Sequence, residues 1–350
     1  MGNILMLEHN IEGRKERAPL GAASYLFNLI GIIGNILVLH VFGTRINASS
    51  NYRVFVIFLS IVDLFTCISH VAKELGRTIS VYNQGHVILI CKVSHYIGNS
   101  VGYAAFLIIC FITFERYKKI CTPFTSQITI THSKIMCLCS VLTGFIVDFP
   151  IYLIYGKRYE LVENINATRC AIQNEYDGDL LPILHLSFLV LGTVIGIVIV
   201  VILQVKIRMA LVKKARSKQK MKQVISTINS ESEQETPASG TPHRKGKHIT
   251  NESKKSTDDQ DSERNRRIAI RFAIISLFLI VSFVSHLLFR FITVTQKYFV
   301  QRQGISKLED IVEEYLPDII TVNGILNPFI YLFTDIQFKQ ELMKMCGRTI

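Results

Sequence analysis

Charged residues are scarce in this chain. They make up 19% of its 350 residues, whereas hydrophobic residues make up 49%. This composition excludes a soluble chain of ordinary charge and favours a membrane protein. The sequence also lacks the alternation of polar and apolar residues that is typical of a transmembrane β-barrel. Its first 18 residues are polar and charged, so no cleavable signal peptide is expected, and the first apolar segment should direct insertion itself.

Seven stretches are long and apolar enough to cross a bilayer as helices. A span needs roughly 20 mostly apolar residues, because the hydrocarbon core is about 30 Å thick and a helix rises about 1.5 Å per residue. The seven stretches lie at about 20–43, 54–76, 93–114, 135–156, 181–206, 268–292 and 315–334. The expected fold class is therefore an all-α membrane protein with a seven-helix bundle over 20–334.

The segments outside the spans are short, with one exception. Residues 1–19 are a short N-terminal segment, and 335–350 are a tail that contains an amphipathic helix. The long loop at about 212–263 is rich in Ser, Thr, Lys and Glu, and it has too few apolar residues to fold alone, so we expect it to be disordered. Its flanks, 206–222 and 264–271, should continue the fifth and sixth helices.

The placement of Lys and Arg predicts the orientation. The loops at about 44–53 and 116–134 contain six basic residues and no acid, and the region 206–271 contains 17 basic and eight acidic residues. These loops should face the cytoplasm, with the N-terminus outside the cell and the chain in the plasma membrane. The net charge of +12 then indicates contact with acidic lipid and protein partners rather than with nucleic acid.

The cysteines do not form a disulfide scaffold. Four lie inside spans and two face the reducing side of the membrane: Cys67, Cys110, Cys137, Cys139, Cys121 and Cys346. Only Cys91 and Cys170 fall on the oxidising side, so they form the one plausible disulfide.

Polar motifs occur at regular places in this apolar sequence. Glu115-Arg116-Tyr117 ends the third span, 25 residues after Cys91, and Asn327-Pro328-Phe329-Ile330-Tyr331 lies near the end of the seventh. Asn35 stands in Gly-Asn-Ile-Leu-Val, and Asp63 is a carboxylate in the middle of the second span, where such a group by default marks function. In these motifs, over about residues 20–346, the chain resembles the rhodopsin-like G-protein-coupled receptors.

This resemblance implies roles for the motif residues. Glu115, Arg116, Tyr117, Asn327, Pro328 and Tyr331 would act in activation and G-protein coupling, with arrestin and receptor kinases as further partners. Asn35 and Asp63 would form a polar core. Asp63, Asn323 and Asn327 would hold a sodium ion, although Ala105 stands where the family often has a serine ligand, and a protonated, hydrogen-bonded Asp63 is the alternative.

The chain also departs from the family. It contains no tryptophan, so the usual fourth-helix and sixth-helix Trp residues are missing. No proline lies between Pro182 and Pro237 or between Pro242 and Pro317, so the fifth and sixth spans lack their usual kinks. No tyrosine lies between residues 176 and 298. Phe278 or Phe283 would have to serve as the aromatic pivot of the sixth helix.

The ligand is less constrained than the fold. Gly98 stands where amine receptors of the family have an aspartate, and Thr321 where opsins have the retinal lysine. The candidates for lining an outer cavity are His95, Asn99, Asp148, His185, His286 and Arg290. Acids outnumber bases ten to six in the outer segments 157–180 and 297–318, which would steer a cationic ligand such as a basic or amidated neuropeptide. Ordinary hydrated loops would look the same.

The motifs around Arg116 and Asn327 resemble those of invertebrate neuropeptide receptors and favour a peptide ligand. A chemosensory receptor for a small molecule is the alternative. A transporter or channel would be expected to show paired repeats or broken helices, which we do not find. An enzyme is not expected, because no metal-ligand cluster or nucleophile–base spacing stands out.

Two modification sites follow from the predicted orientation. Asn166-Ala167-Thr168 is a glycosylation sequon on the outer side. Cys346 ends the amphipathic segment that starts at Phe333, in which Phe338 and Leu342 are four residues apart. It is a candidate for palmitoylation at the inner membrane surface, and an unmodified cysteine is the alternative.

Overall fold

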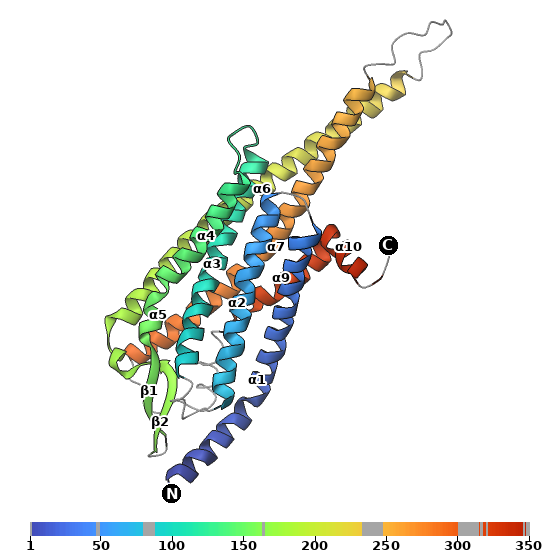
Figure 1. Cartoon of the computed structure of the whole chain (residues 1–350). Helices are drawn as coiled ribbons and strands as arrows, with labels where there is room; N and C mark the ends of the chain where they lie inside the picture. Colours follow the sequence, from blue (N-terminus) through green and yellow to red (C-terminus); the bar gives the residue numbers. More distant parts are fainter. Residues whose placement is uncertain are drawn as a thin grey trace, which may run out of the picture.

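The computed structural model describes residues 2–46, 50–79, 88–162, 165–232, 248–299, 315, 318–319, 321–345 and 347. Long helices pack side by side into a bundle, with the N-terminus and a small β-hairpin at one end and the short last helix at the other (Figure 1). The predicted all-α seven-helix bundle with a short eighth helix is confirmed.

The helices follow the apolar segments of the sequence. Their bounds are α1 Gly2–His40, α2 Asn51–Ile79, α3 Ile88–Cys121, α4 Ile130–Val147, α5 Phe149–Ile154, α6 Leu180–Ser232, α7 His248–Phe299, α9 Thr321–Thr334 and α10 Ile336–Met345. Within the described residues, six helical segments are long and apolar enough to cross a membrane, with α4 and α5 counted as one. The seventh membrane helix contains α9, whose 14 described residues form the part of it next to α10.

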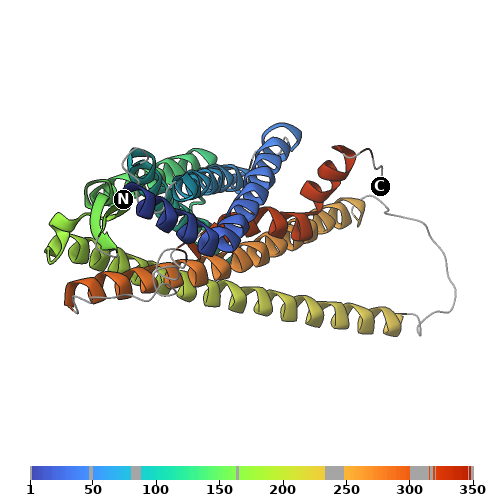
Figure 2. The same ribbon diagram turned by 90° about the horizontal axis from the view of Figure 1, so that it is seen from below.

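Helix extends further than the sequence predicts. α1 begins at Gly2 rather than near residue 20, and it ends in a π-helical turn at Val41–Arg45. α6 continues to Ser232 and α7 begins at His248, so the described parts of the segment expected to be disordered, 212–232 and 248–263, are helical. In Figure 2 the two helices lie side by side and extend beyond the bundle.

The fourth span consists of two helices in line. α4 begins after Thr129, whose hydroxyl accepts a hydrogen bond from the His132 backbone N–H at 3.3 Å, an ordinary N-cap. Asp148 leaves the helical conformation (φ −87°, ψ 3°), and α5 starts again with Pro150 in its first turn. Proline is tolerated there because the first N–H groups of a helix have no intrahelical partner.

Small residues bring the helices close around α3, which has the longest run of buried side chains. A Cβ on Gly144 of α4 would lie 2.2 Å from the Ser100 carbonyl oxygen of α3, so only glycine fits there. A Cβ on Gly196 of α6 would lie 2.6 Å from the ring of Phe106. Close approach at small residues is a common way for helices to associate inside a membrane.

A β-hairpin that the sequence did not predict covers one end of the bundle. Strand β1 (Tyr155–Val162) pairs antiparallel with β2 (Ile165–Ile172), and Lys157 lies opposite Cys170. We call this end, which contains Cys91 and Cys170, the disulfide end. The opposite end, which contains Arg116, is the Arg116 end (Figure 1).

The short α10 lies at the Arg116 end. Phe338 is buried and stacks on Phe42 of the first helix, with ring centroids 5.8 Å apart. Leu342 packs against the same core, while Lys344 is exposed. One face of α10 is therefore apolar and the other polar, as the predicted amphipathic helix requires.

Candidate functional site

A disulfide fixes the hairpin above the start of α3. Cys91, in the first turn of α3, is bonded to Cys170 of β2, and their Cα atoms are 6.4 Å apart. The ring of Tyr155, the first residue of β1, consequently stacks on His95 of α3 with centroids 4.4 Å apart. The two cysteines that the sequence paired thus hold an aromatic side chain over the helix bundle.

A polar cavity lies beneath this hairpin, between α2, α3, α7 and the segment before α9. It is lined by Ser69, His70, Lys73, Ser94, His95, Gly98, Asn99, His286, Arg290 and Asp318. The free volume between them is about 10 Å³, roughly what one water molecule needs. Among the described residues the space between these charged groups is therefore narrow, and a ligand group larger than water must move side chains to enter.

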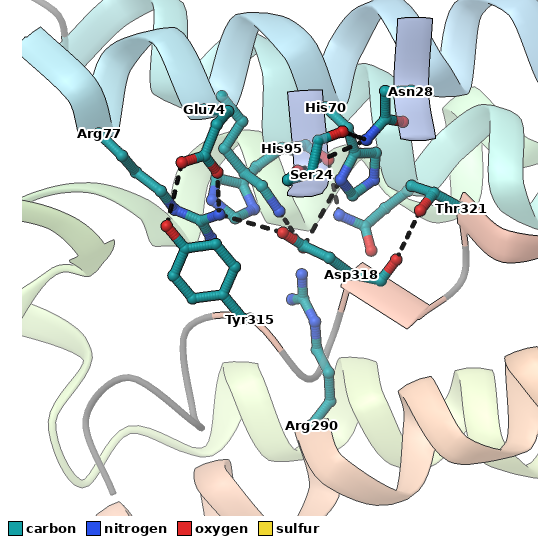
Figure 3. Close-up of polar contacts among 12 residues, drawn as sticks. Ser24, Asn28, His70, Glu74, Arg77, His95, Arg290, Tyr315, Asp318 and Thr321 are labelled. Carbon is teal, nitrogen blue, oxygen red and sulfur yellow. Dashed lines mark hydrogen bonds and ion pairs between the residues drawn. The ribbon is translucent and has the colours of Figure 1, made fainter. Parts of the chain in front are cut away.

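Ion pairs close the side of the cavity next to α2, in a group that we call the Asp318 cluster (Lys73, Glu74, Arg77, Tyr315 and Asp318). Lys73 forms an ion pair with Asp318, and Arg77 lies 3.1 Å from the other oxygen of that carboxylate. Arg77 also binds Glu74 at 3.0 Å, and the Tyr315 hydroxyl donates to Glu74 at 3.0 Å. Figure 3 shows how Glu74, Arg77, Tyr315 and Asp318 of this cluster converge.

Each charge in the Asp318 cluster has an opposite charge beside it. The side chains of Lys73 and Glu74 are almost fully buried, and burying an unpaired charge would cost several kcal/mol. Asp318 is likewise held between two cations, Lys73 and Arg77.

Arg290 enters the cavity from α7. Unlike Lys73 and Arg77, it is bound by a tyrosine and not by a carboxylate. One of its terminal nitrogens donates to the Tyr155 hydroxyl at 2.9 Å, and its guanidinium lies 5.3 Å from the centre of the Tyr155 ring. Its Nε has no hydrogen-bond partner, and no carboxylate of the described residues forms an ion pair with it. In Figure 3 it points toward the Asp318 cluster without a dashed contact to it.

The structure brings together most of the predicted cavity residues. His95, Asn99, His286 and Arg290 all line the cavity, as does Gly98, which leaves no acid on that part of α3. Asp148 and His185 do not line it. They lie at the α4–α5 junction and on α6, with Asp148 buried and 3.5 Å from the His185 ring nitrogen.

Sequence reasoning missed Lys73 as a cavity residue and counted Asp318 only as a loop charge. The signal was present, because Lys73 and Glu74 are ionisable residues within an apolar segment, a pattern that marks functional sites. The two predicted modification sites are Asn166 and Cys346. The side chain of Asn166 and the whole of Cys346 lie outside the part of the chain that the structure describes.

A buried polar network lies deeper in the bundle, around Asp63. Asn327 donates a hydrogen bond to the Asp63 carboxylate at 2.6 Å, and Asn35 donates to the carbonyl oxygen of Gly324 at 2.9 Å. Gly324 precedes Pro328 by four residues, and proline cannot supply the N–H that this carbonyl would otherwise accept. The Asn35 side chain therefore replaces the hydrogen bond that Pro328 removes from α9.

The acid–Arg–Tyr motif lies at the other end of α3. Arg116 is 2% exposed and forms an ion pair with its neighbour Glu115. Asn51 of α2 donates to Glu115 at 3.2 Å and also to the Ile128 carbonyl oxygen at 2.7 Å. The Glu115 carboxylate is therefore fixed by α2 and holds Arg116 in place. Tyr331 of α9 is fully buried and lies edge-on to Phe42, whose ring also stacks on Phe338 of α10.

The cavity, the Asp63 network and the Arg116 motif lie in order along one bundle. Residues 34–331 match the family described as the 7 transmembrane receptor (rhodopsin family). The chain belongs to this family. It is thus a multi-pass membrane receptor of the G-protein-coupled class, and the predicted family is confirmed.

Relatives of this receptor are similar over between about half and nine tenths of its length. The type-1 angiotensin II receptor B of Rattus norvegicus is 26% identical over 323 residues, covering 91% of this chain and 77% of the relative. A neuromedin U receptor homolog of Caenorhabditis elegans is 23% identical over 168 residues, covering 46% and 40%. The crystal structure of squid rhodopsin aligns with a TM-score of 0.67 at 15% identity, over 94% of this chain and 85% of the rhodopsin chain, which shows a shared fold.

The interior of the receptor contains a stacked pair of aromatic rings between α3 and α7. Phe283 of α7 is buried and stacks on Phe106 of α3, with centroids 5.2 Å apart and ring planes 11° apart. Tyr103 lies beside both rings. Phe278, the other candidate for the pivot, is 42% exposed. The structure therefore places Phe283, and not Phe278, in the interior of the receptor.

Proposed function

We propose that the receptor binds a peptide through the cavity at the disulfide end, on the outer face of the plasma membrane, and activates a heterotrimeric G protein at the Arg116 end. The observation that carries this proposal is the polar cavity beneath a disulfide-fixed hairpin. The orientation is supported by the excess of Lys and Arg in the loops at the Arg116 end.

The chemistry of the cavity supports a peptide. Of the ten described residues that line it, nine have polar or charged side chains, and Gly98 is the exception. Such a lining can bind backbone amides and charged groups of a peptide, whereas a small apolar odorant would leave these groups without partners. Two relatives are named as receptors for the peptides angiotensin II and neuromedin U, which supports the same ligand class.

The Arg116 end supplies the surface for the G protein. α6 and α7 extend beyond the bundle there with basic side chains, and Lys214 of α6 donates to the Ile120 carbonyl of α3 at 3.0 Å. The peptide signals only if it binds the active arrangement of these helices more tightly than the resting one. Arg116, buried in this arrangement, would reach the G protein when α3 and α7 move apart.

A sodium ion near Asp63 is part of the proposal. The carboxylate of Asp63 and the side-chain oxygens of Asn323 and Asn327 are buried, and those two amide oxygens have no hydrogen-bond partner. Oxygen donors of this kind suit a small hard cation. Asp63 would supply the charge and the two amides would complete the site, while buried Ala105 offers no ligand atom.

A screen of the expressed receptor tests the proposal. A library of neuropeptides would be applied to cells that carry the receptor, with calcium and cyclic-nucleotide reporters, and cells that carry the Arg116→Ala receptor would serve as the control. We expect some peptides to give responses that the control lacks. A library of small non-peptide molecules would be applied in the same way, and responses to these molecules alone would contradict the peptide assignment and favour a chemosensory receptor.

A further inference from the structure

The charges around the cavity do not cancel. Among the described residues, Lys73, Arg77 and Arg290 are cations at this place, and Glu74 and Asp318 are the acids. Both acids are bound by cations of α2, Glu74 by Arg77 and Asp318 by Lys73 and Arg77. The positive charge that remains is that of Arg290, which interacts at longer range with the buried Asp148 carboxylate but forms no ion pair with it in the described structure.

The guanidinium of Arg290 is held in place, yet some of its N–H donors have no hydrogen-bond partner in the described structure. The Tyr155 ring lies under it, and His95 stacks on the same Tyr155 ring. A guanidinium has five N–H donors, and the described contacts of Arg290 use one terminal nitrogen, which donates to the Tyr155 hydroxyl, and leave Nε without a partner. Arginine in this state can bind a carboxylate through two parallel hydrogen bonds.

From this geometry we propose that the cavity recognises a carboxylate of the ligand, which binds Arg290 and takes the place of Asp318 beside Lys73. The proposal rests on the peptide function proposed above and names the group of the peptide that enters the cavity. That group is either the free C-terminal carboxylate or the side chain of an Asp or Glu.

The ligand carboxylate can enter the cavity if it replaces the Asp318 carboxylate as the partner of Lys73. The cavity has room for only about one water molecule, so the ligand group must displace a side chain. If the ligand carboxylate moves Asp318 away, Lys73 exchanges one carboxylate for another, and Asp318 retains Arg77, which lies 3.1 Å from its second oxygen. No buried charge is left without a partner, and Arg290 gains one.

A cationic ligand fits the cavity less well. It would have to bind Asp318 in competition with Lys73 and Arg77, and its charge would lie near Arg290. The excess of acids in the outer loops predicts a cationic peptide, but Asp177 is already paired with Arg158 at 2.8 Å. Exposed loop charges are also screened by salt, whereas charges in a cavity interact strongly, so the cavity determines the preferred ligand.

Displacement of Asp318 would also disturb the start of the seventh membrane helix. The Thr321 hydroxyl, in the first residue of α9, donates to the Asp318 carbonyl oxygen at 2.9 Å. α9 continues to Asn327, which binds Asp63. The same exchange of carboxylates that admits the ligand therefore acts on the helix that contains the buried polar network.

Matched peptide libraries test this inference. Each sequence would be made with a free C-terminal carboxylate and as the C-terminal amide, and sequences with Asp or Glu would also be made with Asn or Gln. Receptor activation by each member is measured in cells through the reporters described above. We expect removal of one acid group to lower potency about 30-fold or more, since loss of one partner of a desolvated charge pair costs at least that much. Which replacement has this effect identifies the C-terminus or a side chain as the source.

Variants of the receptor show whether Arg290 is the partner. In Arg290→Gln, the difference in potency between the acid and its neutral counterpart should shrink to within about threefold, and Arg290→Lys should keep part of it. Arg158→Gln loses the same charge at the same end of the receptor, outside the cavity, and should keep the full difference. Surface staining confirms that each variant reaches the membrane.

Two results would overturn the inference. One is equal potency of acid and neutral peptides on the unmodified receptor, which needs no variant to fold. The other is an Arg290→Gln receptor that retains the full preference for the acid. If only non-peptide ligands activate the receptor, the peptide function fails, and the same comparison is made between carboxylic acids and their methyl esters, where equal potency would overturn the carboxylate site as well.

Discussion

Arg271 of α7 forms a buried ion pair with Asp335, the residue that joins α9 to α10, at 2.8 Å. Tyr52 of α2 donates to the same carboxylate oxygen at 2.6 Å, and Arg271 also donates to the hydroxyl of Thr334 at 2.9 Å. The other oxygen of Asp335 accepts from the Phe338 backbone N–H at 3.1 Å and caps α10. One carboxylate thus joins the Arg116 ends of α2, α7 and α9 to the start of α10.

This ion pair should restrain α7 in the receptor without ligand. We predict that Arg271→Gln raises ligand-independent signalling several-fold and lowers the melting temperature by several degrees, because it leaves buried Asp335 without its cation. Basal reporter activity per receptor at the cell surface and thermal unfolding in detergent measure the two effects. Arg271→Lys keeps a cation beside Asp335 at the same position and is the control. Unchanged basal activity in Arg271→Gln would show that the pair does not restrain α7.

Arg116 should be essential for coupling rather than for folding. In the described structure its ion-pair partner is its own neighbour Glu115, so its loss breaks no ion pair between helices. We predict that Arg116→Ala abolishes ligand-stimulated G-protein activation while surface expression remains largely intact. Lys119→Ala removes a basic residue from the exposed face of the same helix end and should still signal. Normal signalling by Arg116→Ala would contradict the role assigned to this residue.

The stacked pair of Phe106 and Phe283 provides a prediction with a matched control. Phe283→Ala removes a buried ring between α3 and α7, and we expect ligand-stimulated signalling to fall at least tenfold in potency, with lower thermal stability from the cavity that remains. Phe278→Ala, five residues away on α7 but 42% exposed, should have little effect on either. Similar losses in the two variants would mean that the stacked pair has no special role in activation.

The apolar length of the spans and the position of their polar residues were sufficient to predict the bundle and the family. The hairpin was not predictable, because β1 and β2 carry charged and polar residues such as Lys157 and Arg158 without a regular apolar face. The same reason applies to 248–263, which is polar on all sides and yet helical. In both segments the local pattern contains no apolar periodicity from which to predict regular structure.

The cavity was predictable only in part. His95, Asn99, His286 and Arg290 could be placed by their depth in each span, because helical rise alone sets that depth. The partners of Lys73 could not, since Asp318 is 245 residues away in the sequence and the ion pair depends on how α2 packs near the start of α9. Loop composition therefore predicts a cationic ligand, whereas the cavity favours an anionic group, because the pairing of Asp318 with Lys73 cannot be read from the sequence.

The contribution of the hydrogen bond from Asn35 to Gly324 can be measured in receptors with and without Pro328, the residue that leaves the Gly324 carbonyl oxygen without a donor in its own helix. Asn35→Ala leaves the Gly324 carbonyl oxygen without a donor, which costs about 1–3 kcal/mol and should lower the melting temperature by a few degrees. In a Pro328→Ala background, residue 328 regains a backbone N–H that can bond to this carbonyl within α9. The same Asn35→Ala change should then cost less than half as much.

The matched control for this cycle is Asn28→Ala. Asn28 is also buried on α1, but its side chain donates within its own helix, to the Ser24 carbonyl oxygen at 2.9 Å. Its substitution should cost the same with and without Pro328, because no atom of that hydrogen bond belongs to α9. Melting temperatures of the purified receptor in detergent give all the values. Equal losses from Asn35→Ala in the two backgrounds would show that Asn35 does not compensate for the proline.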